Sequence, residues 1–111
     1  FIMAKISKNQ LDAVVYAKIA ENFTAALAHV NDPRDMERLL NSLFTGTERL
    51  MLAKRLAIAA LLEQGKSYAQ ISKALKVSSV TIGFVRNSIM KSSKPYVELI
   101  KQLSRNISLK I

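Results

Sequence analysis

The chain has 111 residues and a net charge of +9; half of its residues are hydrophobic, and it contains no cysteine and no tryptophan. This length predicts one domain with a small core, and the apolar content excludes a disordered chain. The lack of cysteine excludes a disulfide framework and a thiolate metal site, which fits a reducing cytoplasm. No apolar run is long enough to span a bilayer and no signal peptide is evident, so we expect a cytoplasmic protein without a membrane partner.

The positive charge is concentrated in one part of the chain. Residues 49–94 carry nine basic side chains and one acidic one, whereas residues 1–48 carry five basic and six acidic side chains. Such a concentration is the electrostatic footprint of a protein that binds a polyanion.

Residues 9–30 predict a long first helix that is apolar on several sides. Its apolar residues recur every three to four positions: Leu11, Val14, Val15, Ile19, Phe23, Leu27 and Val30. A chain of this size can hardly cover such a helix, so we expect a second subunit to cover it in an obligate homodimer. A second helix is predicted over 31–44, with Asp32 as its cap and Pro33 in its first turn. The two helices form the predicted dimerisation segment, residues 9–44. The single histidine, His29, is expected to be structural.

A third helix is predicted from the capping box Thr45 to Glu48 as far as Gln64, with Gly65 as a left-handed cap. Its broad apolar surface comprises Leu50, Leu52, Leu56, Ile58, Leu61 and Leu62. Its basic residues contact phosphate, line a pocket or simply solvate the helix, and the sequence leaves these options open: Arg49, Lys54 and Arg55.

Residues 67–89, SYAQISKALKVSSVTIGFVRNSI, predict a helix-turn-helix, whose second helix enters a DNA major groove. Ser67 and Ser78 are placed to cap the two helices. The predicted core-facing positions are Ile71, Ala74, Leu75, Val77, Ile82, Val85 and Ile89. Lys76 stands where such turns usually carry a left-handed glycine, and we expect some backbone strain there. The other interpretation, an ordinary pair of amphipathic helices, is less favoured because of the charge concentration.

The candidate DNA-binding residues are Lys73, Lys76, Ser78, Ser79, Val80, Thr81, Gly83, Arg86 and Lys91. The small residues at the start of the second helix would approach base edges, and the cations, with Lys94, would hold phosphates. Gly83 either permits close approach to the DNA backbone or leaves the helix soft, because a mid-helix glycine costs about 1 kcal/mol relative to alanine.

After a basic loop over 91–95, Pro95 is expected to open a last helix over 95–109, which packs through Val97, Leu99, Ile100, Leu103 and Ile107. No strand pattern or repeat is present. The predicted fold is therefore all-α, with about six helices in a single domain over 1–111 and the helix-turn-helix formed by the fourth and fifth.

This order of helices resembles the Trp repressor superfamily. The matching motifs, within about residues 35–95, are Phe44-Thr45 … Glu48-Arg49, Arg55, Leu61-Leu62 … Gly65, Ile71 … Leu75, Thr81-Ile82 and Asn87-Ser88. The Val77-Ser78 turn and Thr81-Ile82 … Val85 are most similar to the Trp-repressor-like YerC/YecD branch. The resemblance implies an intertwined homodimer that binds palindromic operator DNA.

The resemblance also implies an effector pocket, in which the Trp repressor holds an indole ring between two arginines. Arg55 matches the first arginine, but the second falls on Phe84 and the following glycine on Val85, so charge and space are lost. Thr45 and Ser88 match the remaining polar positions. We expect that L-tryptophan is not the corepressor. Two interpretations stay open: the pocket binds another small molecule, or it is empty or filled by the core, with Phe84 as a packing residue.

The predicted function is that of a sequence-specific DNA-binding transcriptional regulator, favoured as a repressor, that binds double-stranded DNA as a homodimer without a metal. An enzyme is disfavoured because the chain has one histidine, no cysteine, and eight acids expected mostly on exposed faces. The alternatives are a helical protein-interaction module and a non-specific DNA-binding protein. RNA binding would call for more aromatic residues than the 6% present.

Overall fold

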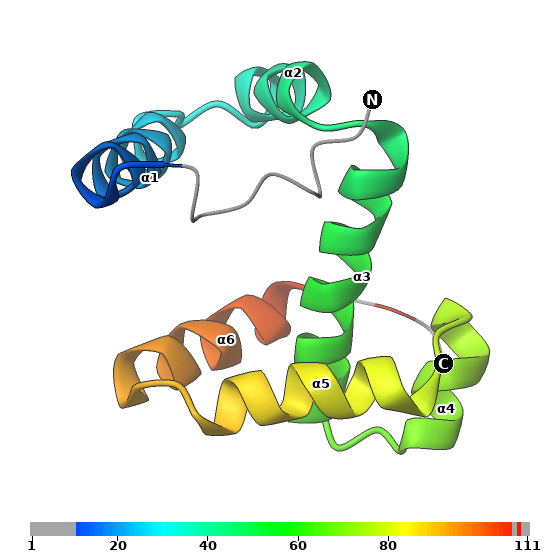
Figure 1. Ribbon diagram of the computed structural model, residues 1–111. Coiled ribbons are helices and arrows are strands. Elements are labelled where there is room, and N and C mark those ends of the chain that lie inside the picture. Colours follow the sequence, from blue (N-terminus) through cyan, green and yellow to red (C-terminus); the bar gives the residue numbers. More distant parts are fainter. Residues whose placement is uncertain (1–10, 108, 110–111) are drawn as a thin grey trace. The chain divides into compact units, whose positions relative to one another are not determined.

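A computed structural model describes residues 11–107 and residue 109 and, over these residues, consists of six α-helices without strands (Figure 1). The prediction of an all-α fold is confirmed. The chain divides into two units at residue 43, each with its own set of helices. The first unit contains helices α1 (Ala13–Ala28) and α2 (Pro33–Leu43), and the second contains α3 (Gly46–Glu63), α4 (Tyr68–Leu75), α5 (Ser79–Met90) and α6 (Lys94–Asn106).

Helix α1 begins later than predicted. The carboxylate of Asp12 accepts a hydrogen bond from the backbone N–H of Val14 at 2.8 Å and so caps the helix at this residue. The predicted start at Asn9 lies outside the described residues. No residue of α1 is buried, and even its apolar side chains are exposed: Val14 is 77% exposed and Ile19 is 51% exposed. The first unit therefore presents apolar side chains at its surface.

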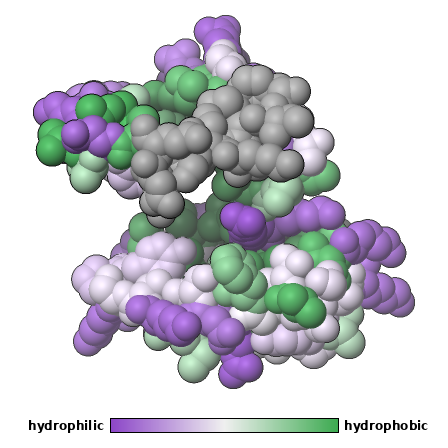
Figure 2. Space-filling view, viewed as in Figure 1, coloured by the Kyte–Doolittle hydropathy of each residue, from purple (hydrophilic) through white to green (hydrophobic). Residues whose placement is uncertain are grey.

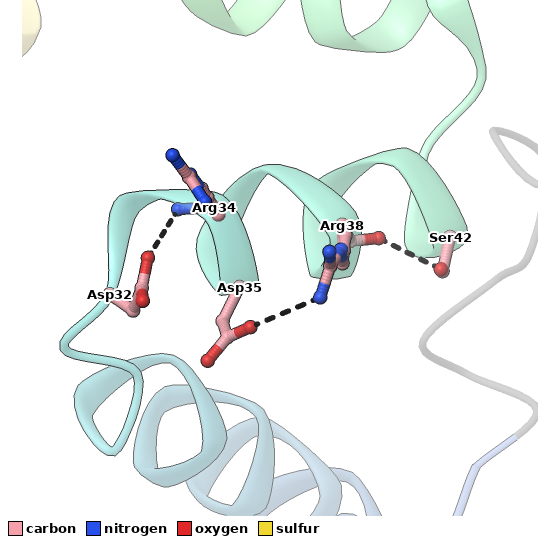
Figure 3. A network of polar contacts seen from close by, with 5 residues as sticks. All are labelled: Asp32, Arg34, Asp35, Arg38 and Ser42. Atoms are coloured by element: carbon pink, nitrogen blue, oxygen red, sulfur yellow. Dashed lines mark hydrogen bonds and ion pairs between the residues drawn. The ribbon is translucent and has the colours of Figure 1, made fainter.

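Helix α2 is stabilised by short-range polar contacts (Figure 3). Asp32 accepts a hydrogen bond from the backbone N–H of Arg34 at 2.8 Å, which confirms its predicted capping role. Arg38 forms an ion pair with Asp35, one helical turn earlier, at 3.6 Å. The Ser42 hydroxyl donates a hydrogen bond to the backbone carbonyl of Arg38. These contacts are exposed to solvent and each is worth only a few tenths of a kcal/mol. The helix thus has local stabilisation but, like α1, no buried residue.

Helix α3 has both predicted ends. Thr45 and Glu48 form a complete capping box, with the Thr45 hydroxyl accepting from Glu48 N–H and the Glu48 carboxylate accepting from Thr45 N–H. At the other end Gly65 has φ 82°, its N–H bonds to the carbonyl of Leu62, and the N–H of Lys66 bonds to the carbonyl of Leu61. This pair of bonds is the Schellman arrangement, which needs a residue at positive φ and hence favours glycine.

Helices α4 and α5 are joined by the short turn 76–78. Ser67 caps α4 in a second capping box with Gln70, and Ser78 caps α5 by accepting from the N–H of Thr81. Lys76 has φ 56° and ψ 51°, so the predicted left-handed turn residue is confirmed. The Ser72 hydroxyl donates to the carbonyl of Val77 at 2.6 Å and so ties α4 to the turn.

The second unit has a core in which α4, α5 and α6 pack on the C-terminal half of α3 (Figure 1). The buried apolar residues of this core are Ile58, Ala59, Ala60, Leu61, Ile71, Ile82, Val85 and Ile100. The Gln64 amide also donates to the carbonyls of Ser104 and Ile107 at 3.1 and 3.2 Å and so joins the ends of α3 and α6.

Several finer predictions were wrong. Ala74 is exposed rather than buried, and Leu75 and Val77 are only partly buried at the edge of the core. In the N-terminal half of α3, Leu50 and Leu52 are exposed, because the other helices of its unit pack on the C-terminal half. Leu56, at the start of the C-terminal half, is exposed as well.

The C-terminal boundaries also differ. Lys94 is the first residue of α6, with Pro95 in its first turn, so the basic loop is shorter than predicted. The helix ends at Asn106 rather than at the predicted residue 109.

Candidate nucleic-acid interface

The start of α5 is an exposed helix end above a buried core. Ile82 and Val85 are buried on one side of the helix, which fixes its rotation. Val80, two residues before Ile82, is 80% exposed. A large apolar residue held this far from the core contributes little to folding, so its side chain is available to a partner.

The predicted DNA-binding residues occupy α4, the turn and α5. Seven of the nine are exposed: Lys73, Lys76, Ser78, Ser79, Val80, Arg86 and Lys91. Thr81 and Gly83 are partly buried. The Thr81 hydroxyl lies 3.1 Å from that of Ser78 and takes part in the cap.

Gly83 has room for a side chain. A Cβ atom at this position would meet the Tyr68 hydroxyl at 4.0 Å, which is ordinary van der Waals contact. The fold of the described residues therefore does not require glycine here, and its helix-destabilising effect is not offset by tighter packing.

The cations of this region are not neutralised within the described part of the chain. Lys73, Lys76 and Arg86 have no carboxylate within ion-pair distance among these residues, unlike Arg38, which pairs with Asp35, and Lys101, which pairs with Glu98. Figure 2 shows hydrophilic side chains projecting from the surface of the second unit. Unpaired, solvated cations leave a positive field that attracts a polyanion.

A cavity of about 310 Å³ lies between α3, α5 and α6. Three of the four predicted effector-pocket residues line it: Arg55, Phe84 and Ser88. The fourth, Thr45, does not, because it precedes Arg55 by ten residues and thus lies about 15 Å away along the helix axis. Thr45 instead acts as the cap of α3.

Arg55 and Phe84 contact each other at this cavity. The guanidinium carbon of Arg55 lies 5.8 Å from the centroid of the Phe84 ring, a cation–π distance. Phe84 is 60% exposed, so the ring does not fill the core. The Ser88 hydroxyl donates to the carbonyl of Phe84 at 3.0 Å and is therefore already used within α5.

Sequence reasoning missed the contribution of α6 to this cavity. Tyr96 and Ile100 line it, and they come from the helix that packs against α3. Ile100 was placed on the apolar stripe of the last helix, but nothing in the stripe indicated which helix would lie opposite. The described residues contain no cluster of potential metal ligands, and none of their helices combines the length and hydropathy needed to cross a membrane.

In a comparison with known families, residues 18–104 match the family described as Trp repressor protein. No curated protein and no solved structure matches the chain. Because the match covers most of the chain, the protein belongs to the Trp repressor family, a family of DNA-binding helix-turn-helix regulators.

Proposed function

We propose that the protein is a sequence-specific transcriptional regulator, a repressor that binds palindromic operator DNA as a homodimer. The observation that carries this proposal is the start of α5, where Val80 and Ser79 are exposed directly above the buried Ile82. A helix held in this way can enter a major groove with its first turn against the base edges. Family membership supports the same function.

Two groups of side chains have different roles in this proposal. Ser78, Ser79 and Val80 approach base edges, with Val80 against a thymine methyl group. The solvated cations hold backbone phosphates and supply affinity without sequence information: Lys73, Lys76, Arg86, Lys91 and Lys94. Repression then follows from occlusion of a promoter.

The homodimer is proposed from the surface of α1. Val14, Val15 and Ile19 are each more than 45% exposed, and apolar side chains clustered on one helix are typical of an interface. Figure 2 shows hydrophobic surface over this helix. Two subunits would place two α5 helices in successive major grooves, about 34 Å apart.

Repeated selection from a pool of randomised duplex DNA at physiological salt tests the proposal. We expect an enriched palindrome with half-sites one helical turn apart. Val80→Ala should relax the selected base at one position per half-site, whereas Lys73→Ala should weaken binding to all sequences alike and flatten the salt dependence. Binding without enrichment would indicate a general DNA-coating protein, and no binding at all would favour a helical protein-interaction module.

The cavity at Phe84 is proposed as an effector site that does not accept L-tryptophan. Arg55 is the only cation among the described residues that line it, and it already contacts the Phe84 ring. Isothermal titration should therefore give no binding heat with L-tryptophan, and the DNA affinity should be the same with and without it. A tenfold tighter DNA complex with L-tryptophan would contradict this assignment.

A further inference from the structure

Helix α5 carries a second large apolar side chain outside the core. Phe84 is 60% exposed, and Val80, one turn before it, is 80% exposed. Since successive helical residues are rotated by about 100°, these two lie only about 40° apart around the helix axis. The buried residues Ile82 and Val85 lie about 140–160° from Val80. Val80 and Phe84 therefore form one exposed apolar row on the side of α5 that faces away from the core.

The ring of Phe84 is held in place without being covered. The guanidinium carbon of Arg55, on α3, lies 5.8 Å from the centroid of the ring. This contact orients the ring from one side, and most of the residue stays exposed. A side chain that is already ordered loses less conformational entropy when a partner covers it. The row is thus a preorganised apolar surface.

The charge around the row favours DNA as the partner that covers it. Residues 67–91 contain four cations and no acidic residue. Among the described residues, no carboxylate lies within ion-pair distance of Lys76 or Arg86. The partner must therefore combine negative charge with an apolar group. The major groove of DNA does so, because the methyl group of thymine lies there between two phosphate backbones.

We propose that Phe84 is a further specificity-determining residue, which contacts the methyl group of a second thymine beside the one at Val80. This inference rests on the proposed function, because it requires DNA at α5. The four residues from Val80 to Phe84 rise by about 6 Å along the helix, close to two base-pair steps of about 3.4 Å. The preferred half-site then contains two thymines about two steps apart, and Phe84 reads one of them.

The first experiment selects binding sites from randomised duplex DNA with the wild type and three variants. Thermal melting and sedimentation velocity first establish that each variant is folded and has the oligomeric state of the wild type. Phe84→Ala should lose the preference for one thymine and keep the other, and Val80→Ala should do the reverse. Met90→Ala is the matched control, because Met90 is 70% exposed on α5 but lies about 80° from Val80 around the axis. This variant should select the wild-type site.

The second experiment replaces the thymine assigned to Phe84 by deoxyuridine in the selected duplex. This change removes the methyl group and keeps every hydrogen-bonding group of the base pair. Wild-type affinity should fall about fourfold, the loss expected when one methyl group is withdrawn from apolar contact. The affinity of Phe84→Ala should be the same for both duplexes.

The outcomes separate this inference from the proposed function. If the wild type enriches a palindrome that Phe84→Ala selects unchanged, the inference is overturned and the proposed function stands. A site without the two thymines, or a loss of affinity by Phe84→Ala that is equal for all sequences, overturns the inference in the same way. If the wild type enriches no sequence at all, both fail together.

Discussion

The two units of the chain contain helices of similar apolar content but differ in what they bury. The second unit has fully buried side chains from α3, α4 and α5, among them Leu61, Ile71 and Ile82. Helices α1 and α2 have none, although α1 is the more hydrophobic of the two. Hydrophobic residues are stabilising only where other side chains cover them, since the gain follows the area removed from water.

This difference separates two sources of stability. The second unit can be stabilised by contacts within one chain, whereas α1 requires contacts that a single chain does not supply over the described residues. If a second subunit supplies them, the stability of α1 depends directly on protein concentration. The stability of the core of the second unit then depends on concentration only indirectly, through the coupling of folding to dimer formation. Substitutions in the two units should therefore behave differently.

The largest effect is expected from a charge placed on α1. Ile19→Asp should abolish the proposed dimer, because a carboxylate would be buried at the interface without a partner. Sedimentation velocity at several concentrations should show a monomer for this variant and a dimer for the wild type. Asn22→Asp adds the same charge on the same helix at a polar, exposed position and should remain dimeric. An unchanged dimer in Ile19→Asp would show that α1 is not the interface.

The next largest effect is expected in the core of the second unit. Leu61→Ala should lower the free energy of unfolding by about 3 kcal/mol, since it removes a fully buried side chain and leaves a cavity. Urea denaturation measures this loss. Val80→Ala, at an 80% exposed position, should change stability by less than about 0.5 kcal/mol. Equal losses for the two variants would contradict the assignment of core and surface.

A smaller effect of opposite sign is expected at the turn. Lys76→Gly should raise the free energy of unfolding by about 1 kcal/mol, because glycine adopts the left-handed conformation without strain. The same substitution at Lys73, inside α4, should lower it by about 1 kcal/mol. Thermal melting of both variants tests the pair, and a destabilised Lys76→Gly would mean that the lysine side chain contributes more than its backbone costs.

The smallest effect is expected at Gly83. Gly83→Ala should raise stability by about 0.5–1 kcal/mol, because a Cβ meets no closer contact than 4.0 Å. DNA affinity then distinguishes the two interpretations of this glycine. Tighter binding by the variant would indicate that softness of α5 weakens the wild-type complex, and weaker binding would indicate that the DNA backbone approaches Gly83 closely.

The local features of the fold could be predicted from the sequence because each depends on neighbouring residues. Ser67, Ser78 and Thr45 cap the helices as expected, and the left-handed positions fall on Gly65 and Lys76. Caps and turns need only a side chain and a backbone N–H a few residues away.

The longer-range features were harder to predict. The apolar spacing of α3 gives the same signal at Leu52 and at Ile58, yet only Ile58 is covered within the second unit. Periodicity identifies a face but not the helix that packs on it. For the same reason, Tyr96 could not be assigned to the cavity at Phe84.

The Gln64 side chain has a consequence for how the chain acquires its structure during synthesis. Its amide bonds to the carbonyls of Ser104 and Ile107, 40 and 43 residues later. The α4–α5 pair leaves the ribosome before these carbonyls do, so the apolar side of α3 that receives Ile100 stays open until the last helix has emerged and packed. A chain truncated after α5 would thus display an α4–α5 pair and an uncovered α3, and exposed apolar surface of this kind favours chaperone binding and aggregation.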